Sequence, residues 1–198
     1  ELFPIMPMRL LIRLLIFFVC PMFFAVVCGR AAPVSPELKL APLFRDHAVL
    51  QRERPVPVWG RAEAGGTIVV SFHDQTVRTV AAADGAWRVE LAPLAASGEG
   101  SDLVATGKTS VTLHDVVVGD VWLCAGQSNM GRNVGQALNP KEEIATARFP
   151  LIRHIAVRDT LADAPAFDVG TTGWQRTAPE TVARFTAVGY FFAREIHR

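Results

Sequence analysis

A short apolar run followed by small polar residues is the stretch of this chain best suited to carry chemistry. Residues 121–125 read Val-Trp-Leu-Cys-Ala, and Gly126, Gln127, Ser128 and Asn129 follow directly. This pattern predicts a buried strand that ends in a tight turn before a helix. A serine in such a turn is exposed, and the N–H groups at the start of the helix point outward, where they stabilise a developing oxyanion. Ser128 is therefore a candidate nucleophile for ester hydrolysis.

The same residues also have a purely structural interpretation. A Ser-Asn pair after a strand often serves as a helix cap or a turn. The second glycine is Gly131, three residues after Ser128, and this spacing differs from that of the Gly-x-Ser-x-Gly nucleophile elbow. Composition and spacing leave both interpretations open.

The longer block from Gly119 to Met130 adds a resemblance to a known family. It resembles the nucleophile block of the sialate O-acetylesterases, carbohydrate esterases with an SGNH-hydrolase-type domain. The similarity continues in residues 42–52, 55–60 and 187–195, so it spans nearly all of the chain after about residue 40. The resemblance implies that Ser128 takes up an acetyl group from an O-acetylated sugar, such as a 9-O-acetylated sialate.

The chemistry that the resemblance implies is acyl transfer through an acetyl-enzyme. Ser128 attacks the acetyl carbonyl, its backbone N–H helps to hold the oxyanion, and water later releases acetate. Gly126 is expected to supply the tight turn. Gln127 and Asn129 either orient the turn or contact the substrate. No metal or organic cofactor is expected.

The partners of the serine are missing from the sequence. A serine hydrolase needs a histidine base and a carboxylate that orients it. The family carries this pair in an Asp-x-x-His arrangement near the end of the domain, and no Asp-x-x-His occurs here. The histidines after Ser128 are His154 and His197, and neither matches the family's position. We therefore expect this chain to be the first part of a longer esterase, inactive by itself, with the apolar face of Phe191 and Phe192 uncovered.

The first residues have the features of a secretory signal. Arg9 and Arg13 flank the start of an apolar run, residues 14–27, which is followed by small residues up to Ala31. This order predicts a signal peptide over residues 1–31 and a secreted or periplasmic protein that has no membrane segment after cleavage. The alternative is an uncleaved anchor, because residues 10–27, interrupted only by Arg13 and Pro21, approach the length that spans a membrane.

Charge and cysteine content exclude several other classes. The chain has 20 Lys and Arg against 19 Asp and Glu, and a near-neutral chain is not expected to bind nucleic acid. Of three cysteines, Cys20 and Cys28 lie in the predicted leader and Cys124 alone lies outside it. The sequence therefore predicts neither an internal disulfide nor a metal cluster, and we expect Cys124 to be a small core residue.

Residues 40–117 are predicted to form a small antiparallel β-sandwich. They contain six short runs rich in β-branched and aromatic residues, namely 56–61, 67–72, 76–81, 87–91, 103–105 and 111–113. Asp84-Gly85, between two of these runs, predicts a hairpin. Trp59 and Trp87 are expected in the core, although they could stack on a sugar. A secreted, non-catalytic carbohydrate-binding protein is therefore the alternative function.

Residues 118–198 change to a mixed α and β pattern. The sequence predicts a helix over 140–148, a strand over 151–157 and a helix that follows Thr186. This order implies a parallel sheet flanked by helices, the start of a doubly wound, flavodoxin-like domain of the SGNH type. The expected fold class is α/β, with the sandwich first and an incomplete hydrolase domain after it.

Overall fold

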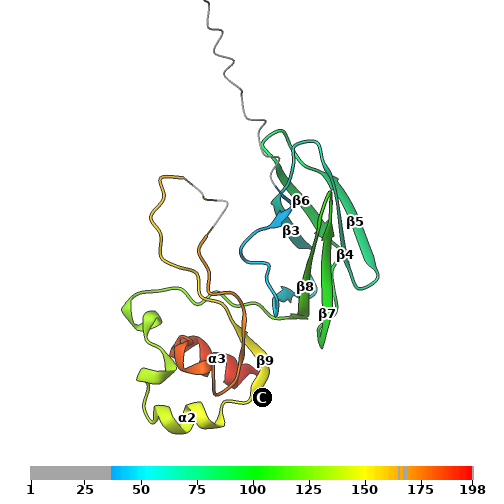
Figure 1. Cartoon of the computed structure of the whole chain (residues 1–198). Helices are drawn as coiled ribbons and strands as arrows, with labels where there is room; N and C mark the ends of the chain where they lie inside the picture. The colour runs from blue at the N-terminus through cyan, green and yellow to red at the C-terminus, as the bar shows by residue number, and fades with distance from the viewer. Residues whose placement is uncertain (1–36, 165, 167–168, 198) are drawn as a thin grey trace, which may run out of the picture. The chain divides into compact units, whose positions relative to one another are not determined.

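The computed structural model describes residues 37–164, 166 and 169–197 (Figure 1). The chain divides into two units, Glu1–Val34 and Ser35–Arg198. Everything below concerns the second unit, and the predicted signal peptide lies outside the described residues. Among those residues, no helix has the length and apolar character needed to cross a membrane.

Eight strands precede the serine block. They are β1 (Lys39–Leu40), β2 (Val49–Gln51), β3 (Val56–Arg61), β4 (Thr67–Phe72), β5 (Gln75–Val80), β6 (Ala86–Leu91), β7 (Ser97–Thr106) and β8 (Ser110–Gly119). All six predicted runs fall on strands β3 to β8. The described strands form a three-stranded sheet in the order β1-β3-β6 and a five-stranded sheet in the order β2-β8-β7-β4-β5. Within the described residues, every pair in these sheets is antiparallel except β2 with β8.

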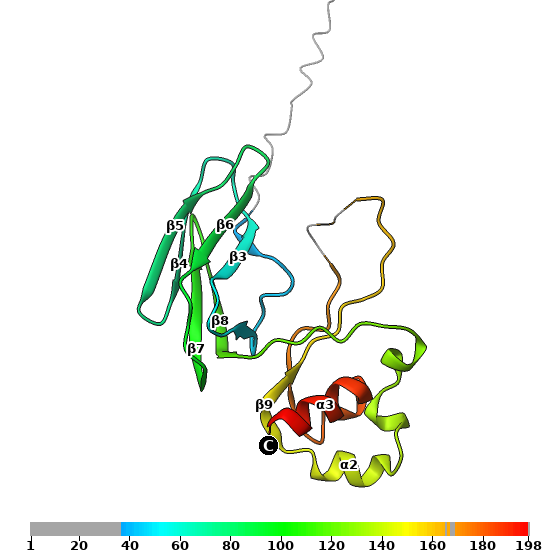
Figure 2. The same ribbon diagram turned by 180° about the vertical axis from the view of Figure 1, so that it is seen from behind.

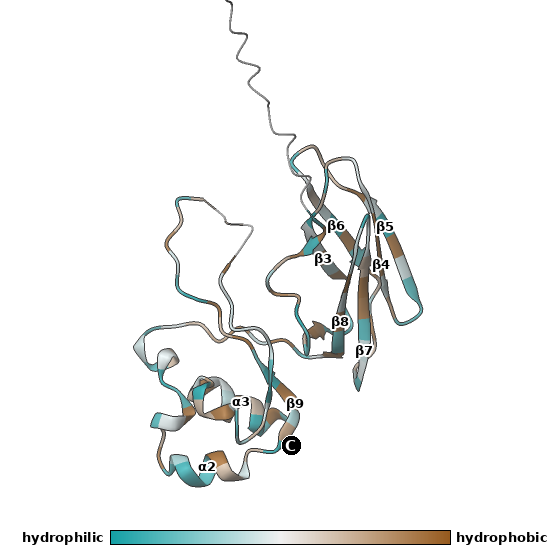
Figure 3. Ribbon diagram, in the orientation of Figure 1, coloured by the Kyte–Doolittle hydropathy of each residue, from teal (hydrophilic) through white to brown (hydrophobic). Residues whose placement is uncertain are grey.

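Both sheets contribute to one hydrophobic core. On β6 the alternation is as predicted, with Trp87, Val89 and Leu91 buried, and Val70 and Phe72 of β4 join them from the other sheet. Figure 3 shows brown, hydrophobic stretches along β6 and β7. Trp87 is therefore a core residue, as expected, because it is buried among these side chains. Burying one large apolar side chain of this kind contributes about 1.5–3 kcal/mol to the stability of the fold.

The Asp84-Gly85 turn is real, but the hairpin is wrong. Gly85 has a φ of 82°, the left-handed conformation that glycine adopts without strain. The turn joins β5 to β6, yet β5 pairs with β4 and β6 pairs with β3. The turn therefore carries the chain from one sheet to the other, because pairing is decided by distant strands and not by the turn.

Short elements follow the serine block. They are η1 (Ser128–Gly131), η2 (Val134–Gln136), α2 (Pro140–Thr146), β9 (Phe149–His154), β10 (Gln175–Thr177), η3 (Val182–Arg184) and α3 (Ala187–His197). Both predicted helices are present as α2 and α3, and the strand predicted over 151–157 is present as β9, although it begins and ends earlier than predicted. A second cluster, Val134, Ala147, Val182, Phe185 and Tyr190, holds them together. Figures 1 and 2 show α3, in red, beside β9.

The described residues confirm a mixed α/β protein that is mostly sheet with two α-helices, but one expectation about residues 118–198 is wrong. β9 pairs with β10 in antiparallel orientation, and no parallel pair of strands is present among the described residues after Gly119. The predicted buried strand at 121–125 is an extended, exposed segment, and Leu123 is 90% exposed. A strand needs a neighbour for its backbone N–H and C=O groups, and no described strand pairs with this segment.

Candidate active site

Ser128 is the first residue of η1 and is exposed, together with Gly126, Gln127 and Asn129. Exposure of the serine is as predicted. The element that follows is a single turn of 3₁₀ helix rather than a longer α-helix, and it is closed by a hydrogen bond from Met130 N to Gln127 O at 2.9 Å. Among the described residues, the Ser128 hydroxyl makes no hydrogen bond. The serine is thus exposed to solvent, and its hydroxyl is not bound to any histidine or carboxylate of the described residues.

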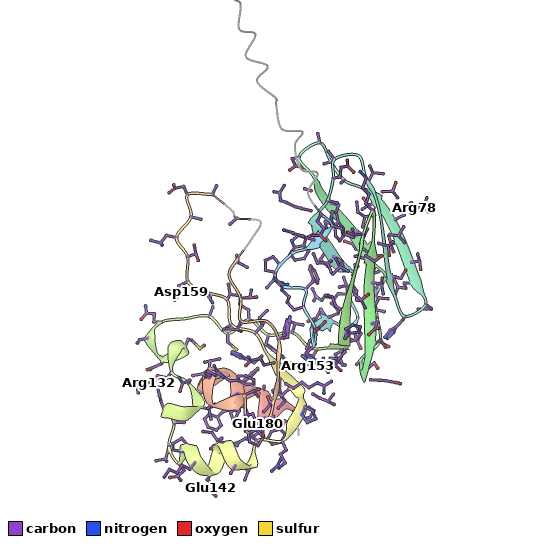
Figure 4. All side chains as sticks on the ribbon, viewed as in Figure 1. Arg78, Arg132, Glu142, Arg153, Asp159 and Glu180 are labelled. Atoms are coloured by element: carbon purple, nitrogen blue, oxygen red, sulfur yellow. The ribbon has the colours of Figure 1, made fainter. Side chains whose placement is uncertain are left out.

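The residues before α3 hold the serine turn from the other side. The Thr186 hydroxyl donates to Met130 O at 2.8 Å, and Ala187 N donates to Arg132 O at 2.8 Å. Thr186 also forms an antiparallel bridge with Asn133. Figure 4 labels Arg132, whose guanidinium has no hydrogen-bond or ion-pair partner among the described residues. The backbone after Ser128 is therefore fixed by α3, while the side chains around it face solvent.

Cys124 is exposed, so its predicted core position is wrong. It lies against α3, where a Cβ added to Gly189 would come within 3.1 Å of Cys124 Sγ. Nearby, the rings of Trp122 and Phe192 meet edge to face with centroids 5.1 Å apart. Through these contacts residues 121–125 pack against α3 on one side, while their side chains remain exposed to solvent.

Neither histidine after Ser128 is placed to act as its base. His154, at the end of β9, stacks on Phe185 with ring centroids 4.4 Å apart, and its Nε2 accepts a long hydrogen bond, 3.5 Å, from Thr186 N. Burial lowers the pKa of His154, which favours the neutral ring that can accept this bond. His197 is exposed at the end of α3. Neither ring makes a hydrogen bond to Ser128.

A histidine and carboxylate pair does exist elsewhere, and sequence reasoning missed it. His47 Nδ1 lies 2.6 Å from Asp115 Oδ2, but the same carboxylate also binds Arg153 at 3.1 Å and Arg176 at 2.5 Å. Burial alone raises the pKa of Asp115, but hydrogen bonds from Arg176, His47 and Arg153 outweigh it and lower the pKa below its usual range. Within the described residues no hydrogen bond links this cluster to Ser128, and its carboxylate is already bound by two arginines.

Two further histidines, His73 and His114, lie in the β-strand region before the serine block. His114 Nδ1 lies 2.9 Å from Asp102 Oδ1 with both side chains exposed, and His73 stacks on Phe72. Among the described residues, no group of three or more His, Cys, Asp or Glu side chains is placed to hold a metal ion. The candidate site therefore consists of Ser128, its exposed neighbours and the elements that hold them.

The sequence was compared with known proteins. No family model matches the sequence. Sialate O-acetylesterases from Pongo abelii and Homo sapiens are each 29% identical to it over 178 residues, 80% of this chain and 34% of theirs. The enzyme of Rattus norvegicus is 31% identical over 143 residues, 66% of this chain and 26% of its own. This chain is similar to sialate O-acetylesterases.

A solved structure agrees with these sialate O-acetylesterase matches. The crystal structure of a carbohydrate acetylesterase from Xanthomonas citri matches with a TM-score of 0.78 and 37% identity, over 81% of this chain and 37% of that one. A match over 80% of 198 residues includes the middle of the chain, and so includes Ser128. The resemblance inferred from the serine block is confirmed. The chain spans about a third of the length of the sialate O-acetylesterases it matches.

Proposed function

We propose that this chain supplies the serine nucleophile of a carbohydrate O-acetylesterase, and that Ser128 is that nucleophile. The observation that carries the proposal is the exposed Ser128 on a turn anchored by Thr186 and Ala187, in a chain similar to sialate O-acetylesterases. The substrate is an acetyl ester on a sugar or glycan, of the 9-O-acetylated sialate type.

The reaction has two steps that leave the enzyme unchanged. The Ser128 Oγ–H bond breaks, Oγ bonds to the acetyl carbon, and the sugar oxygen leaves with a proton as the free hydroxyl. Water then attacks the acetyl-serine, acetate departs, and Oγ regains its proton. The Ser128 N–H donates to the carbonyl oxygen when it becomes negative. Gly126 precedes the turn, which a hydrogen bond closes between Gln127 and Met130, so the turn that Gly126 was expected to supply begins one residue later. Gln127 and Asn129 face the substrate side. No metal or organic cofactor takes part.

The proton acceptor comes from polypeptide outside residues 1–198. Within the described residues, Ser128 Oγ has no hydrogen-bond partner and the His47–Asp115 pair is bound by two arginines. Without a base, the serine hydroxyl is a weak nucleophile at neutral pH. The 198-residue chain alone is therefore an inactive or nearly inactive part of the enzyme.

Exposed apolar residues around the serine block support such a completion. They are Val121, Trp122 and Leu123 before the turn and Val188, Phe192 and Ile196 on α3, here called the Trp122–Phe192 surface. On α3 these residues recur every four positions, so they form one stripe. The opposite side of the helix, with Tyr190, is buried. Residues 121–125 become a strand of a doubly wound, SGNH-type sheet when further strands pair with them and cover this surface.

Residues 1–31 act as a cleaved secretory signal in this proposal. The charged residues Arg9 and Arg13 and the apolar run that follows support it. The mature esterase then meets glycans outside the cytoplasm. The mass of the mature protein tests cleavage, because an uncleaved leader adds residues 1–31 to it.

A carbohydrate-binding role without catalysis is the second candidate. Trp59 is partly exposed and lines an open, mostly apolar groove of about 530 Å³ with Pro57 and Arg88. A sugar ring could stack on such an indole. Sugar binding that survives Ser128→Ala, with no ester hydrolysis by the complete gene product, would favour this function.

The deciding experiment measures acetate release from a chromogenic acetyl ester. It compares the protein expressed from its complete reading frame, the 198-residue chain, and Ser128→Ala in the complete protein. The complete protein is expected to be active and the short chain inactive, and Ser128→Ala is expected to lose about a thousandfold in kcat or more. Ser110→Ala, a change at an exposed serine of β8, is the matched control and keeps full activity. Full activity of Ser128→Ala would refute the proposal.

A further inference from the structure

We propose that Thr186 and Gly189, at the start of α3, are positioning residues that set the place of the Ser128 turn and thereby control kcat. The inference rests on the proposed function, because it takes Ser128 as the nucleophile. It concerns residues about 60 positions away along the chain. Neither residue touches the substrate, and each acts through the backbone that carries the serine.

The first argument is the Thr186 hydroxyl. It donates to Met130 O, the carbonyl two residues after Ser128, at 2.8 Å. Carbonyls in the last turn of a helix have no partner within that helix, so a side-chain donor fixes the end of the turn. Thr186 is itself held, because its N–H faces His154 Nε2 at 3.5 Å. Thr186 therefore links two elements: its hydroxyl binds η1, and its backbone N–H binds His154 at the end of β9.

The second argument is the backbone register between the two segments. Ala187 N donates to Arg132 O at 2.8 Å and Val134 N donates to Phe185 O at 3.0 Å, with Asn133 paired to Thr186 between them. Residues 132–134 thus run against residues 185–187 as a short antiparallel pair. A shift of α3 along this pair moves the serine turn with it.

The third argument is the close approach at Gly189. A Cβ at this position would lie 2.7 Å from Thr186 Cγ2 and 3.1 Å from Cys124 Sγ. The first distance is shorter than real carbon contacts allow, so a methyl group there forces Thr186 or the helix to move. Cys124 lies four residues before Ser128. Gly189 therefore lets α3 contact the chain on both sides of the nucleophile, directly at Cys124 and through Thr186 at Met130.

Small displacements matter at a nucleophile. A misplacement of about 1 Å can cost about a hundredfold in rate, because the attacking oxygen no longer meets the carbonyl in line. The ester used in the tests below, 4-nitrophenyl acetate, has no sugar ring for Gln127 and Asn129 to contact, so a shift of the turn is expected to change its binding little. The expected signature of both residues is a loss in kcat with KM unchanged.

The first test compares Thr186→Val and Thr186→Ser in the protein from the complete reading frame, assayed with 4-nitrophenyl acetate. Valine keeps the shape of threonine and removes the hydroxyl, whereas serine keeps the hydroxyl. We expect Thr186→Val to lower kcat about tenfold to a hundredfold with KM within about twofold, and Thr186→Ser to keep kcat near that of the wild type. Thermal unfolding of each variant reports whether the fold is kept.

The second test uses the steric contact and remains informative if Thr186→Val does not fold. Gly189→Ala is expected to lower kcat, since its methyl group meets Thr186 Cγ2. Combining it with Thr186→Ser removes that carbon and keeps the hydroxyl, so the double variant is expected to recover most of the lost kcat. A purely destabilising pair of changes would instead add their losses.

The outcomes separate this inference from the proposed function. If Ser128→Ala is fully active, the proposed function fails. If Ser128→Ala is inactive while folded Thr186→Val has wild-type kcat, the positioning role alone is wrong. A change confined to KM, equal losses in Thr186→Val and Thr186→Ser, or no recovery in the Gly189→Ala and Thr186→Ser double variant would each overturn it as well.

Discussion

Asp115 lies 2.6 Å from His47 Nδ1 while its other oxygen binds Arg153, whose side chain is only 2% exposed. This carboxylate thus neutralises a buried guanidinium at the contact between β8 and β9. Arg153 also donates to the Asp115 carbonyl. In this position the carboxylate stabilises the fold and does not orient a catalytic imidazole.

The first prediction is that Asp115→Asn destabilises the protein without a specific effect on catalysis. Removing one partner of a buried ion pair leaves the other charge uncompensated, which costs about 3–5 kcal/mol. Chemical denaturation measures the free energy of unfolding. The kcat of the folded fraction is expected to stay unchanged.

Asp102→Asn provides the matched control for Asp115→Asn. Asp102 also binds a histidine, His114, at 2.9 Å, but both side chains are more than half exposed. Exposed pairs contribute little, so the change is expected to lower the free energy of unfolding far less than Asp115→Asn does. Equal losses in the two variants would contradict the role given to Arg153.

The second prediction concerns pH and His154. Its folded-state pKa lies below the ordinary value of 6.5 because burial disfavours the charged ring. The stability contributed by the neutral ring is therefore fully present above the unfolded pKa, about 6.5, and is lost as the pH falls from there through the folded-state pKa. His154→Gln keeps an acceptor for Thr186 N and cannot titrate. The variant is expected to show a smaller fall in unfolding free energy between pH 7 and pH 5, and an unchanged slope would refute the assignment.

The third prediction tests whether the Trp122–Phe192 surface is covered in the complete protein. Phe192→Ser in the 198-residue chain is expected to change the free energy of unfolding by less than about 1 kcal/mol, because the ring is 41% exposed there. In the protein from the complete reading frame the same change is expected to cost about 3 kcal/mol or more, as for a buried aromatic ring. Val80→Ser, at an exposed valine on β5, is the control and has a small effect in both. Equal effects of Phe192→Ser in the two proteins would show that the surface stays open.

The fourth prediction concerns Trp87, which is 3% exposed and whose Nε1 has no hydrogen-bond partner among the described residues. Trp87→Phe removes an unsatisfied buried donor, which stabilises the fold by about 1–3 kcal/mol. The smaller ring also loses packing contacts, which destabilises the fold by a similar amount. The net change in unfolding free energy is expected to be below about 1.5 kcal/mol, whereas Trp87→Ala costs about 3–5 kcal/mol. A large cost for Trp87→Phe would indicate a hydrogen bond to the indole.

The same variants test the carbohydrate-binding alternative. If the groove beside Trp59 binds a sugar, Trp59→Ala is expected to weaken binding and Trp87→Phe is not.

Local patterns predicted the elements of this fold better than their partners. The alternation of Trp87, Val89 and Leu91 identified β6 and its buried face. Successive side chains of a strand point to opposite faces, so a strand with one buried face has an apolar residue at every second position. The partner of β6 is β3 in a different sheet from β5, and nothing near Asp84-Gly85 encodes that choice. Pairing depends on residues far apart in the sequence, so short patterns miss it.

The same limit explains the errors at the candidate site. The apolar run at 121–125 indicates burial, but an apolar pattern does not say which part of a protein covers it, and within the described residues nothing pairs with this run. The Asp115 cluster draws on four residues, His47, Asp115, Arg153 and Arg176, with no characteristic spacing. Thr186 was identified as a helix start, but its bond to Met130 depends on the fold. The serine block was the part that sequence alone could identify, because its residues are contiguous.

The first core has a consequence for biosynthesis. Its buried members all lie between Leu38 and Val118, and Trp174 is the one later residue, among those described, that packs on it. Protein synthesis proceeds from the N-terminus, and early segments fold while later ones are still being made. The two sheets can therefore close while the serine block is still inside the ribosome, so that residues 121–125 emerge beside a folded neighbour. Ribosome-bound chains stalled just beyond residue 150 should already resist protease across residues 38–118.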